Sequence, residues 1–354
     1  MFRNIKIAEI KFGNRFNIFY GNNGQGKTNF LEAIFYLGTV KSFRHARNRD
    51  MIAWDQPSAN LQCSLADNGL LHDLSIALDN NGRQLKVDGK HITKVIDYCS
   101  TFSVVAFSPE EMGMVSGTPE QRRRYLDRAI FSSNPGYLSI YYDYFRVLKQ
   151  RNKLLKMCNY AGMEAWTEQL ATAGARLVSI RHKYIEELAE LFFKYYINIS
   201  GSDEEASLCY HANSLSDLTD QVEIRNLLFS ILTESGRLER ERGMTLNGPH
   251  RDDLEFILNK KPIREHGSQG QQKSFVLALK MAEIEYLERI SGRLPILLLD
   301  DMTAELDSNR TWHLMKFLTD REMQVFISTT DPDTVPLATE LDCSRFHVES
   351  GRLV

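Results

Sequence analysis

The sequence has few cysteines, no paired cysteine motif and no long hydrophobic run. Its five cysteines are scattered over 354 residues and include no C-x-x-C pair. This argues against a disulfide framework or a cysteine zinc site, and it fits a reducing compartment. No apolar run approaches the ~20 residues of a membrane-spanning helix, and the charged, alternating N-terminal segment lacks the pattern of a secretory signal. We therefore expect a cytoplasmic protein with no membrane partner.

An excess of either charge is also missing. The chain has 43 Lys and Arg against 46 Asp and Glu, a net charge of −3. This balance argues against wholesale nucleic-acid binding but leaves local basic patches open. Hydrophobic residues make up 43% of the chain and charged residues 25%, as in an ordinary folded globular protein. A chain of this length predicts two lobes rather than one core.

The motif around which the chain is organised is GNNGQGKT, from Gly21 to Thr28. It fits G-x-x-x-x-G-K-[ST], the phosphate-binding loop. Phe16 to Tyr20 predicts a buried strand before it, and Thr28 to Leu37 an amphipathic helix after it. Strand, glycine turn and helix together aim backbone N–H groups at phosphate oxygens. A glycine-rich turn without a ligand is the less favoured interpretation.

This motif predicts the nucleotide and its metal. Lys27 is expected to reach the β- and γ-phosphates of ATP, and the Thr28 hydroxyl to bind Mg²⁺. The residues expected to bind ATP are Gly21, Asn22, Asn23, Gly24, Gln25, Gly26, Lys27, Thr28 and Asn29.

A second motif brings two acids to the end of a predicted strand. The apolar run Pro295 to Leu299 is followed by Asp300 and Asp301, and α/β sheets place ligands at the carboxyl ends of their strands. Asp300 is expected to hold Mg²⁺ as a Walker-B aspartate. Asp301 is expected to be the catalytic residue that orients or deprotonates the attacking water. An apolar strand running into a capped turn is the alternative without a function.

A third motif precedes the second. Ser268, Gln269, Gly270 and Gln271 open a strongly helical segment, which could be either a plain helix cap or an anion site. A fourth motif follows the two acids. It consists of Glu305, Leu306 and Asp307 and comes directly after Ala304. This last motif corresponds to the D-loop. The four motifs stand in the order found in ABC-type ATPases, namely phosphate loop, S-x-G-Q helix, apolar strand with Asp-Asp, and D-loop. In that arrangement the S-x-G-Q signature of one protomer closes on the nucleotide of the other.

The chain resembles the RecF family of SMC-like ABC ATPases over nearly its whole length. Beside the motifs above, the resemblance rests on KSFR (Lys41 to Arg44), FSPEEMGMVSGTPEQRRRYLD (Phe107 to Asp127), LKQRNKLLK (Leu148 to Lys156) and GPHRDDLEF (Gly248 to Phe256). It implies an ATP-dependent homodimer that binds DNA at single-strand/double-strand gaps and promotes RecA loading with RecO and RecR. It also implies a weak, Mg²⁺-dependent, DNA-stimulated ATPase, whose hydrolysis drives release. Thr329 and Thr330 stand where many ABC proteins have a switch histidine, and Ser108-Pro109-Glu110 is the best candidate for the glutamine loop.

The fold class expected from these motifs is α/β. Residues 1–110 and 245–354 are expected to form an ABC-type ATPase head, with a mixed or parallel sheet, flanking helices and an antiparallel β subdomain. Alternating segments predict strands at 5–10, 61–65, 74–78 and 254–258, with a hairpin turn at Asp79 to Gly82. Apolar runs predict strands at 295–299 and 324–328, with a helix over 307–318 between them, typical of a parallel sheet.

An inserted helical lobe is expected over residues 111–244, because Lys27 and Asp300 are much further apart than one crossover unit needs. Apolar positions from Tyr137 to Leu155 and from Trp166 to Leu191 predict two helices. The second has the spacing of a seam for a partner helix and would form a short coiled-coil-like arm.

Two groups of cations in this lobe are candidates for DNA contacts, namely Arg122, Arg123 and Arg124, and Lys149, Arg151 and Lys153. Each group alone is more typical of a solvated face, but on an SMC-like scaffold they favour phosphate contacts. The loop from Lys41 to Arg49 is the next candidate.

Two other functions fit part of the sequence. The ATPase subunit of an ABC-type transporter shares the nucleotide motifs but lacks a helical block with such cations. A P-loop kinase or GTPase needs no S-x-G-Q element.

Overall fold

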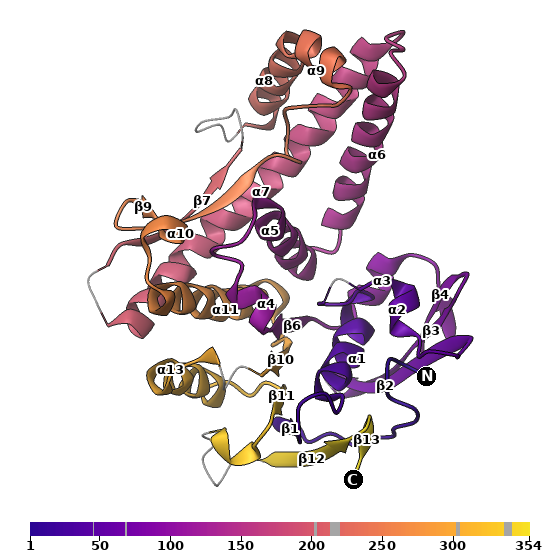
Figure 1. Ribbon diagram of the computed structural model, residues 1–354, viewed down its shortest axis with the longest axis vertical. Coiled ribbons are helices and arrows are strands. Elements are labelled where there is room, and N and C mark those ends of the chain that lie inside the picture. The colour runs from indigo at the N-terminus through magenta and orange to yellow at the C-terminus, as the bar shows by residue number, and fades with distance from the viewer. Residues whose placement is uncertain (45, 68, 202–203, 213–219, 302–304, 336–341) are drawn as a thin grey trace. The chain divides into compact units, whose positions relative to one another are not determined.

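The computed structural model describes residues 1–354 except 45, 68, 202–203, 213–219, 302–304 and 336–341 (Figure 1). The chain divides into two compact units. Unit 1 comprises residues 1–113 and 284–354, and unit 2 is the continuous segment 114–283. The first boundary lies close to the predicted one, whereas the second lies at 283/284 rather than 244/245. The difference arises because the strand at 253–258 pairs with 206–211 and so belongs to unit 2.

The main sheet of unit 1 has six strands in the order β13-β12-β1-β11-β10-β6. All neighbours are parallel except β12 and β13, so the predicted parallel sheet is confirmed. The strands β1, β10 and β11 are almost entirely buried, as expected of strands covered on both faces. Their bounds are β1 Phe16–Tyr20, β6 Val104–Phe107, β10 Ile296–Asp300, β11 Val325–Thr329, β12 Cys343–Glu349 and β13 Arg352–Leu353.

A separate antiparallel sheet completes the strands of unit 1 and confirms the predicted β subdomain. It consists of β2 Ser58–Asp67, β3 Leu70–Asp79, β4 Gly82–Val87 and β5 Lys90–Ile92. The predicted turn connects β3 and β4, where Asp79 Oδ1 accepts from the N–H groups of Asn81 and Gly82 at 2.8 Å each. The helical segments of unit 1 are α1 Lys27–Thr39, α2 Asn48–Met51, α3 Val95–Cys99, α4 Pro109–Met112, α13 Ser308–Thr319 and η1 Pro332–Thr334.

The predicted strand at residues 5–10 is wrong. In the part of the chain that the structure describes, this segment forms no ladder, and only isolated bridges join Phe2 to Ile5 and to Ile52. Ile7, which the alternation placed on a buried face, is 88% exposed. Alternation produces a strand only where a neighbouring strand satisfies the backbone hydrogen bonds. Both edges of the adjacent strand β1 are already occupied by β11 and β12.

Unit 2 is mainly helical, as expected. Its helices are α5 Pro119–Ser133, α6 Tyr137–Lys156, α7 Met163–Ser200, α8 Gln221–Glu234, α9 Gly236–Arg242 and α10 Ile263–His266, and α11 Gln269–Ser291 begins in it and crosses the boundary. A three-stranded antiparallel sheet contains β7 Ala206–His211, β8 Asp253–Leu258 and β9 Lys261–Pro262.

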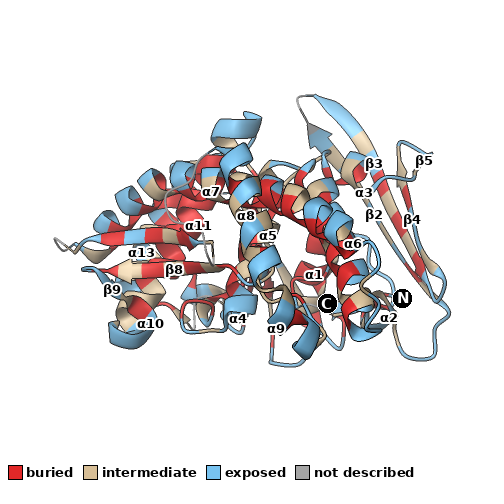
Figure 2. Cartoon of the chain, turned by 90° about the horizontal axis from the view of Figure 1, so that it is seen from above, coloured by how far each residue is buried: buried red, intermediate tan, exposed pale blue. Residues whose placement is uncertain are grey.

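The longest helix, α7, has 38 residues and extends about 57 Å at 1.5 Å per residue. It packs against α6 and α8, so the predicted helix seam is confirmed. The seam positions Leu170, Leu177, Tyr184, Leu188 and Leu191 are all buried. Figure 2 shows a buried and an exposed side on α7.

Candidate nucleotide site and signature motif

The phosphate-binding loop lies between the end of β1 and the start of α1 in unit 1. Gly21, Gly24 and Gly26 have φ angles of 138°, 78° and 108°, a region that side-chain-bearing residues rarely adopt. Asn22, Asn23 and Gly24 are exposed at the turn of the loop. Helix α1 has no acidic residue in its first turn and no side-chain cap. Its N-terminus therefore offers backbone donors and a positive dipole end to an anion.

Lys27 lies folded back over this loop. Its Nζ donates to the carbonyl oxygens of Gly21 at 2.8 Å and Asn22 at 3.0 Å, and the residue is only 5% exposed. The ammonium group of Lys27 is thus held inside the loop, close to where the backbone N–H groups would bind a phosphate.

A hydroxyl and a carboxylate meet beside the loop. Thr28 Oγ1 donates to Asp300 Oδ1 at 2.9 Å, and Ser328 Oγ donates to the same oxygen at 2.6 Å. Asp300 ends β10, and Ser328 is its register partner on β11. Burial raises the pKa of Asp300, while the hydrogen bonds from Ser328 and Thr28 oppose the rise.

These oxygen atoms suit Mg²⁺. A magnesium ion in a nucleotide site takes one or two protein oxygens and completes its shell with water and phosphate. Thr28 and Asp300 supply that number. Among the described residues no group of three or more His, Cys, Asp or Glu side chains could hold a metal.

Asp301 follows in an unusual backbone conformation. Its φ angle is 51°, and its N–H lies 3.0 Å from Ser328 Oγ and 3.2 Å from the Ser328 carbonyl oxygen. The charge of Asp301 contributes to the raised pKa of Asp300, so the two carboxylates are electrostatic neighbours. Local strain of this kind is common at functional positions, and here the hydrogen bonds of β11 hold it in place.

The predicted switch and D-loop residues lie in different environments. Thr329 is 1% exposed and its Oγ1 donates to the Asp331 carbonyl oxygen at 3.1 Å, whereas Thr330 is exposed. In the D-loop, Asp307 caps α13 by accepting from the Arg310 N–H at 2.9 Å, Leu306 is buried, and Glu305 is partly exposed. Ala304 lies outside the described residues.

The signature motif belongs to unit 2 and opens α11. Ser268 N–H donates to Gln271 Oε1 at 2.8 Å, and Gln271 N–H donates to Ser268 Oγ at 3.2 Å. This reciprocal pair is a capping box, so the helix-cap interpretation describes the local structure. Ser268 and Gln269 are exposed, and Gly270 is partly exposed. The cap leaves the hydroxyl hydrogen of Ser268 available to an anion, so the two interpretations are compatible.

Sequence reasoning missed a clamp that both ends of the chain place on the phosphate-binding loop. The Gln25 side-chain oxygen accepts from Ser350 N–H at 2.7 Å, and its carbonyl oxygen accepts from Gly351 N–H at 2.8 Å. Asn4 Nδ2 donates to the same carbonyl oxygen at 3.2 Å. Gln25 is therefore held by the turn between β12 and β13. No motif marks Ser350 or Gly351, so the sequence alone carried no signal for them.

We expect Gly351→Ala to weaken ATP binding about tenfold although Gly351 itself is no motif residue. Its φ angle is +75°, and an added Cβ would lie 2.3 Å from the Asn4 carbonyl oxygen, so the turn must move away from Gln25. Gly89→Ala is the matched control, because Gly89 has the same φ angle of +75° but no atom within 4 Å of its Cβ position. In both variants the left-handed backbone costs about 1–2 kcal/mol. Titration with a fluorescent ATP analogue should separate them, and equal affinities would contradict a role for the clamp.

A buried carboxylate beside the loop was also missed. Glu32 on α1 is fully buried, and it accepts from Arg3 at 2.9 and 3.1 Å and from the Ser42 hydroxyl at 2.5 Å. The KSFR motif thus anchors its loop through Ser42. Exposed Arg44 donates to Asn29 Oδ1 at 3.4 Å, and its charge counteracts the raised pKa of Asp300. The structure therefore places Arg44 near Asp300, one of the predicted metal ligands. His45, in the same loop, lies outside the described residues.

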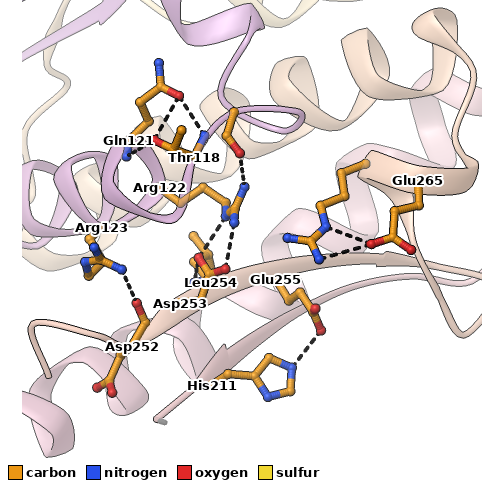
Figure 3. A network of polar contacts seen from close by, with 12 residues as sticks. Thr118, Gln121, Arg122, Arg123, His211, Asp252, Asp253, Leu254, Glu255 and Glu265 are labelled. Atoms are coloured by element: carbon orange, nitrogen blue, oxygen red, sulfur yellow. Dashed lines mark hydrogen bonds and ion pairs between the residues drawn. The ribbon is translucent and has the colours of Figure 1, made fainter. Parts of the chain in front are cut away.

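Two of the predicted DNA contacts, Arg122 and Arg151, are wrong, because both side chains are buried in ion pairs. Arg122 is 1% exposed and bonds Asp253 at 2.8 and 2.6 Å (Figure 3). Arg151 is 2% exposed and bonds Glu239 at 2.6 Å and Thr245 at 2.8 Å. Neither guanidinium is available to a phosphate.

The other candidates differ in accessibility. Arg123 is partly buried and donates to the Asp252 carbonyl oxygen at 2.6 Å (Figure 3). Arg124 is exposed but paired with Glu120. Lys149 and Lys153 are exposed, and within the described chain neither forms an ion pair. Of the six candidates, only Lys149 and Lys153 are both exposed and without an ion pair in the described chain, as a phosphate contact requires.

The motif GPHRDDL is largely structural in unit 2. Pro249 accepts from buried Arg181 at 2.7 Å, His250 pairs with Tyr144 at 2.6 Å, and Asp253 accepts from Arg122. Burial lowers the pKa of His250 to about 4. The residues of this motif therefore stabilise unit 2 through contacts between its segments.

Comparisons with known proteins agree with this geometry. The family model RecF/RecN/SMC N terminal domain matches residues 1–350. DNA replication and repair protein RecF of Geobacter metallireducens is 48% identical over 99% of this chain and 96% of its own, and that of Geobacter sulfurreducens is 47% identical over the same shares. The solved structure of the recombination mediator protein RecF with ATPrS, in the RecFOR pathway, matches with a TM-score of 0.91 and 32% identity, covering 99% of this chain and 95% of that one.

A more distant match concerns the fold alone. An SMC head bound to the C-winged helix domain of ScpA matches with a TM-score of 0.55 at 15% identity, covering 100% of this chain and 94% of that one. The predicted α/β fold of the ABC ATPase head is thereby confirmed. These comparisons lend no support to the transporter alternative. None of the described helices is long and apolar enough to cross a membrane.

Proposed function

The chain belongs to the RecF family of DNA replication and repair proteins, and on this basis we propose that it is an ATP-dependent DNA-binding ATPase of recombinational gap repair. In this proposal it binds Mg²⁺-ATP, dimerises on it, and binds DNA at junctions of single and double strands. A solved relative is a recombination mediator of the RecFOR pathway, which supports RecO and RecR as partners. In the proposal the protein acts in the cytoplasm and RecA is loaded indirectly.

The observation that carries the nucleotide part of the proposal is the Thr28–Asp300 pair beside the phosphate-binding loop. A hydroxyl and a buried carboxylate 2.9 Å apart would hold Mg²⁺, which neutralises charge on the phosphates. Lys27 would exchange its two carbonyl partners for phosphate oxygens. Asp301, beside them on the same strand end, would accept a proton from the attacking water.

The dimer would complete each nucleotide site. Ser268 and the N-terminus of α11 offer a hydroxyl and a helix dipole to a phosphate, and Ser268 and Gln269 at this helix start are exposed. In the proposal this motif meets the ATP bound by the other protomer. Hydrolysis would remove the γ-phosphate that both protomers share, and the dimer would open.

We expect Ser268→Arg to leave ATP binding by the monomer intact and to abolish ATP-dependent dimerisation, because a long cationic side chain would fill the space of the partner's phosphate. Ser139→Arg is the control, since Ser139 is an exposed serine near the start of α6. Sedimentation with and without ATP measures both. Normal dimerisation of Ser268→Arg would contradict the composite site.

The surface best suited to DNA is one face of α6. Arg146, Lys149, Lys153 and Lys156 are spaced three or four residues apart and all are exposed, although Arg146 also pairs with Asp143 at 3.3 Å. They form one stripe along the helix. Cations in such a line can follow the phosphates of a DNA strand. We name these four residues the α6 stripe.

Replacing Lys149, Lys153 and Lys156 with alanine should weaken DNA binding and flatten its salt dependence, by up to ~0.9 on a log–log plot for each phosphate that the protein no longer neutralises. Arg151 is left unchanged, because breaking a buried ion pair costs about 3–5 kcal/mol. A control that replaces exposed Lys6, Lys11 and Lys90 removes the same charge from unit 1. Equal salt slopes for the two triple variants would move the DNA surface away from the α6 stripe.

A further inference from the structure

Gln271, the last residue of the signature motif, is held by a carboxylate. Its Nε2 donates to Glu204 Oε1 at 2.6 Å, while its Oε1 accepts from Ser268 N–H. Both ends of the amide are therefore engaged, and its orientation is fixed. Gln271 cannot turn toward a partner without breaking one of these bonds.

Glu204 is itself tied to the end of the long helix. Its second oxygen accepts from the Tyr196 hydroxyl at 2.8 Å, and Tyr196 is fully buried. The Tyr196 ring packs on Phe275 of α11 with a centroid distance of 4.8 Å. The carboxylate is thus built into the contact between the last turns of α7 and the first turns of α11, and it does not swing freely in solvent.

Through Gln271, the carboxylate of Glu204 lies close to the start of α11, where Ser268 would meet a phosphate. A carboxylate near a helix N-terminus compensates the positive end of the helix dipole. A γ-phosphate at Ser268 would make the same interaction and would be repelled by the anion already there. Gln271 is neutral and adds no charge of its own between Glu204 and Ser268.

We propose that Glu204 is a positioning residue that orients Gln271 and, by its negative charge, weakens the grip of the signature motif on the partner's ATP. This inference rests on the proposed composite site. In a separate protomer Glu204 stabilises the start of α11. In the closed dimer it opposes the γ-phosphate, so that a higher ATP concentration is needed to close the dimer.

The test is Glu204→Gln, which keeps the size and an acceptor oxygen for Gln271 but removes the charge. Glu205→Gln is the matched control, because Glu205 is the next residue and is exposed. The measurement is the ATP concentration at half-maximal dimerisation, determined by sedimentation at low and at high salt. ATP binding by the monomer is measured in parallel.

We expect Glu204→Gln to dimerise at about fivefold lower ATP than the wild type at low salt, with monomer binding unchanged. The difference should shrink at ~1 M salt, where charges are screened beyond about 3 Å. A purely structural role would not produce this salt dependence. Tyr196→Phe should leave the charge in place and dimerise at wild-type ATP or above.

Two outcomes would overturn the inference. In the first, Glu204→Gln and Glu205→Gln both match the wild type at low salt. In the second, the Glu204→Gln effect stays unchanged at high salt. Ser268→Arg separates this failure from that of the proposed function. If Ser268→Arg blocks dimerisation while Glu204→Gln has no effect, only the role of Glu204 is wrong; if Ser268→Arg also dimerises normally, the composite site itself is wrong.

Discussion

Lys27→Ala is expected to lower the affinity for ATP at least about 100-fold. Charge-assisted hydrogen bonds contribute about 1.5–3 kcal/mol each, and Lys27 would supply them to the β- and γ-phosphates from inside the loop. The variant also removes the donor that bonds the Gly21 and Asn22 carbonyl oxygens. The loop would then lose both its cation and part of its own support.

Isothermal titration with ATP and Mg²⁺ measures this effect, and thermal unfolding without nucleotide checks that the variant is folded. Arg44→Ala is the comparison, because Arg44 is a second cation near Asp300 but is exposed. A general effect of positive charge would lower affinity in both variants equally. Near-wild-type binding by Lys27→Ala would show that the loop does not hold the phosphates as assigned.

Asp301→Asn is expected to slow ATP turnover about 100-fold and to prolong the residence of the protein on DNA. Removing a general base typically costs a factor of about 10² to 10⁴. Asn has the size of Asp and tolerates the left-handed backbone that Asp301 adopts, so the strand end should keep its shape. ATP would still close the dimer, and the release step would be missing.

Asp300→Asn is the matched comparison at the neighbouring position. Its amide oxygen can still accept from Thr28 and Ser328, but the site loses the charge that would hold Mg²⁺, so ATP binding should become less dependent on the metal. The measurements are the ATPase rate and the DNA dissociation time of both variants under ATP. Dissociation of Asp301→Asn from DNA at the wild-type rate would mean that hydrolysis is not the release step.

Asp301 is itself predicted to make the wild-type enzyme slow. It stands where most ABC ATPases place a glutamate, which is one methylene longer. Its backbone is additionally fixed by the Ser328 hydrogen bonds, so the carboxylate has little freedom to reach a water. Slow turnover fits an ATPase whose binding of ATP, rather than its hydrolysis, brings the protomers together.

The local features of the nucleotide site could be predicted from the sequence. Strand β1 has the predicted bounds Phe16–Tyr20, because a short, mostly apolar segment before a glycine turn has few other conformations in a folded α/β protein. The carboxyl end of β10 likewise places Asp300 beside Thr28, as the order of the motifs implied. The positions of these residues follow from short-range sequence patterns and from the regular geometry of a parallel sheet.

Contacts between distant segments could not be predicted. Arg122 and Arg151 belong to cation groups that look alike in sequence to the exposed lysines of the α6 stripe. Their burial depends on Asp253 and Glu239, which come from far along the chain. The spacing of a charge along a helix shows which face it occupies but not whether an acid from another segment covers that face.

The clamp on Gln25 has a consequence for the order in which the protein matures during synthesis. The phosphate-binding loop is made at residues 21–28, but its neighbours β11 and β12 and the Ser350–Gly351 turn are made only after unit 2. Unit 2, by contrast, is a continuous segment whose internal contacts are all available once residue 283 has left the ribosome. A nascent chain can therefore order unit 2 before the segments that contact the phosphate-binding loop have been synthesised. ATP would stabilise only the finished polypeptide, so every ribosome-bound intermediate must persist without help from its ligand.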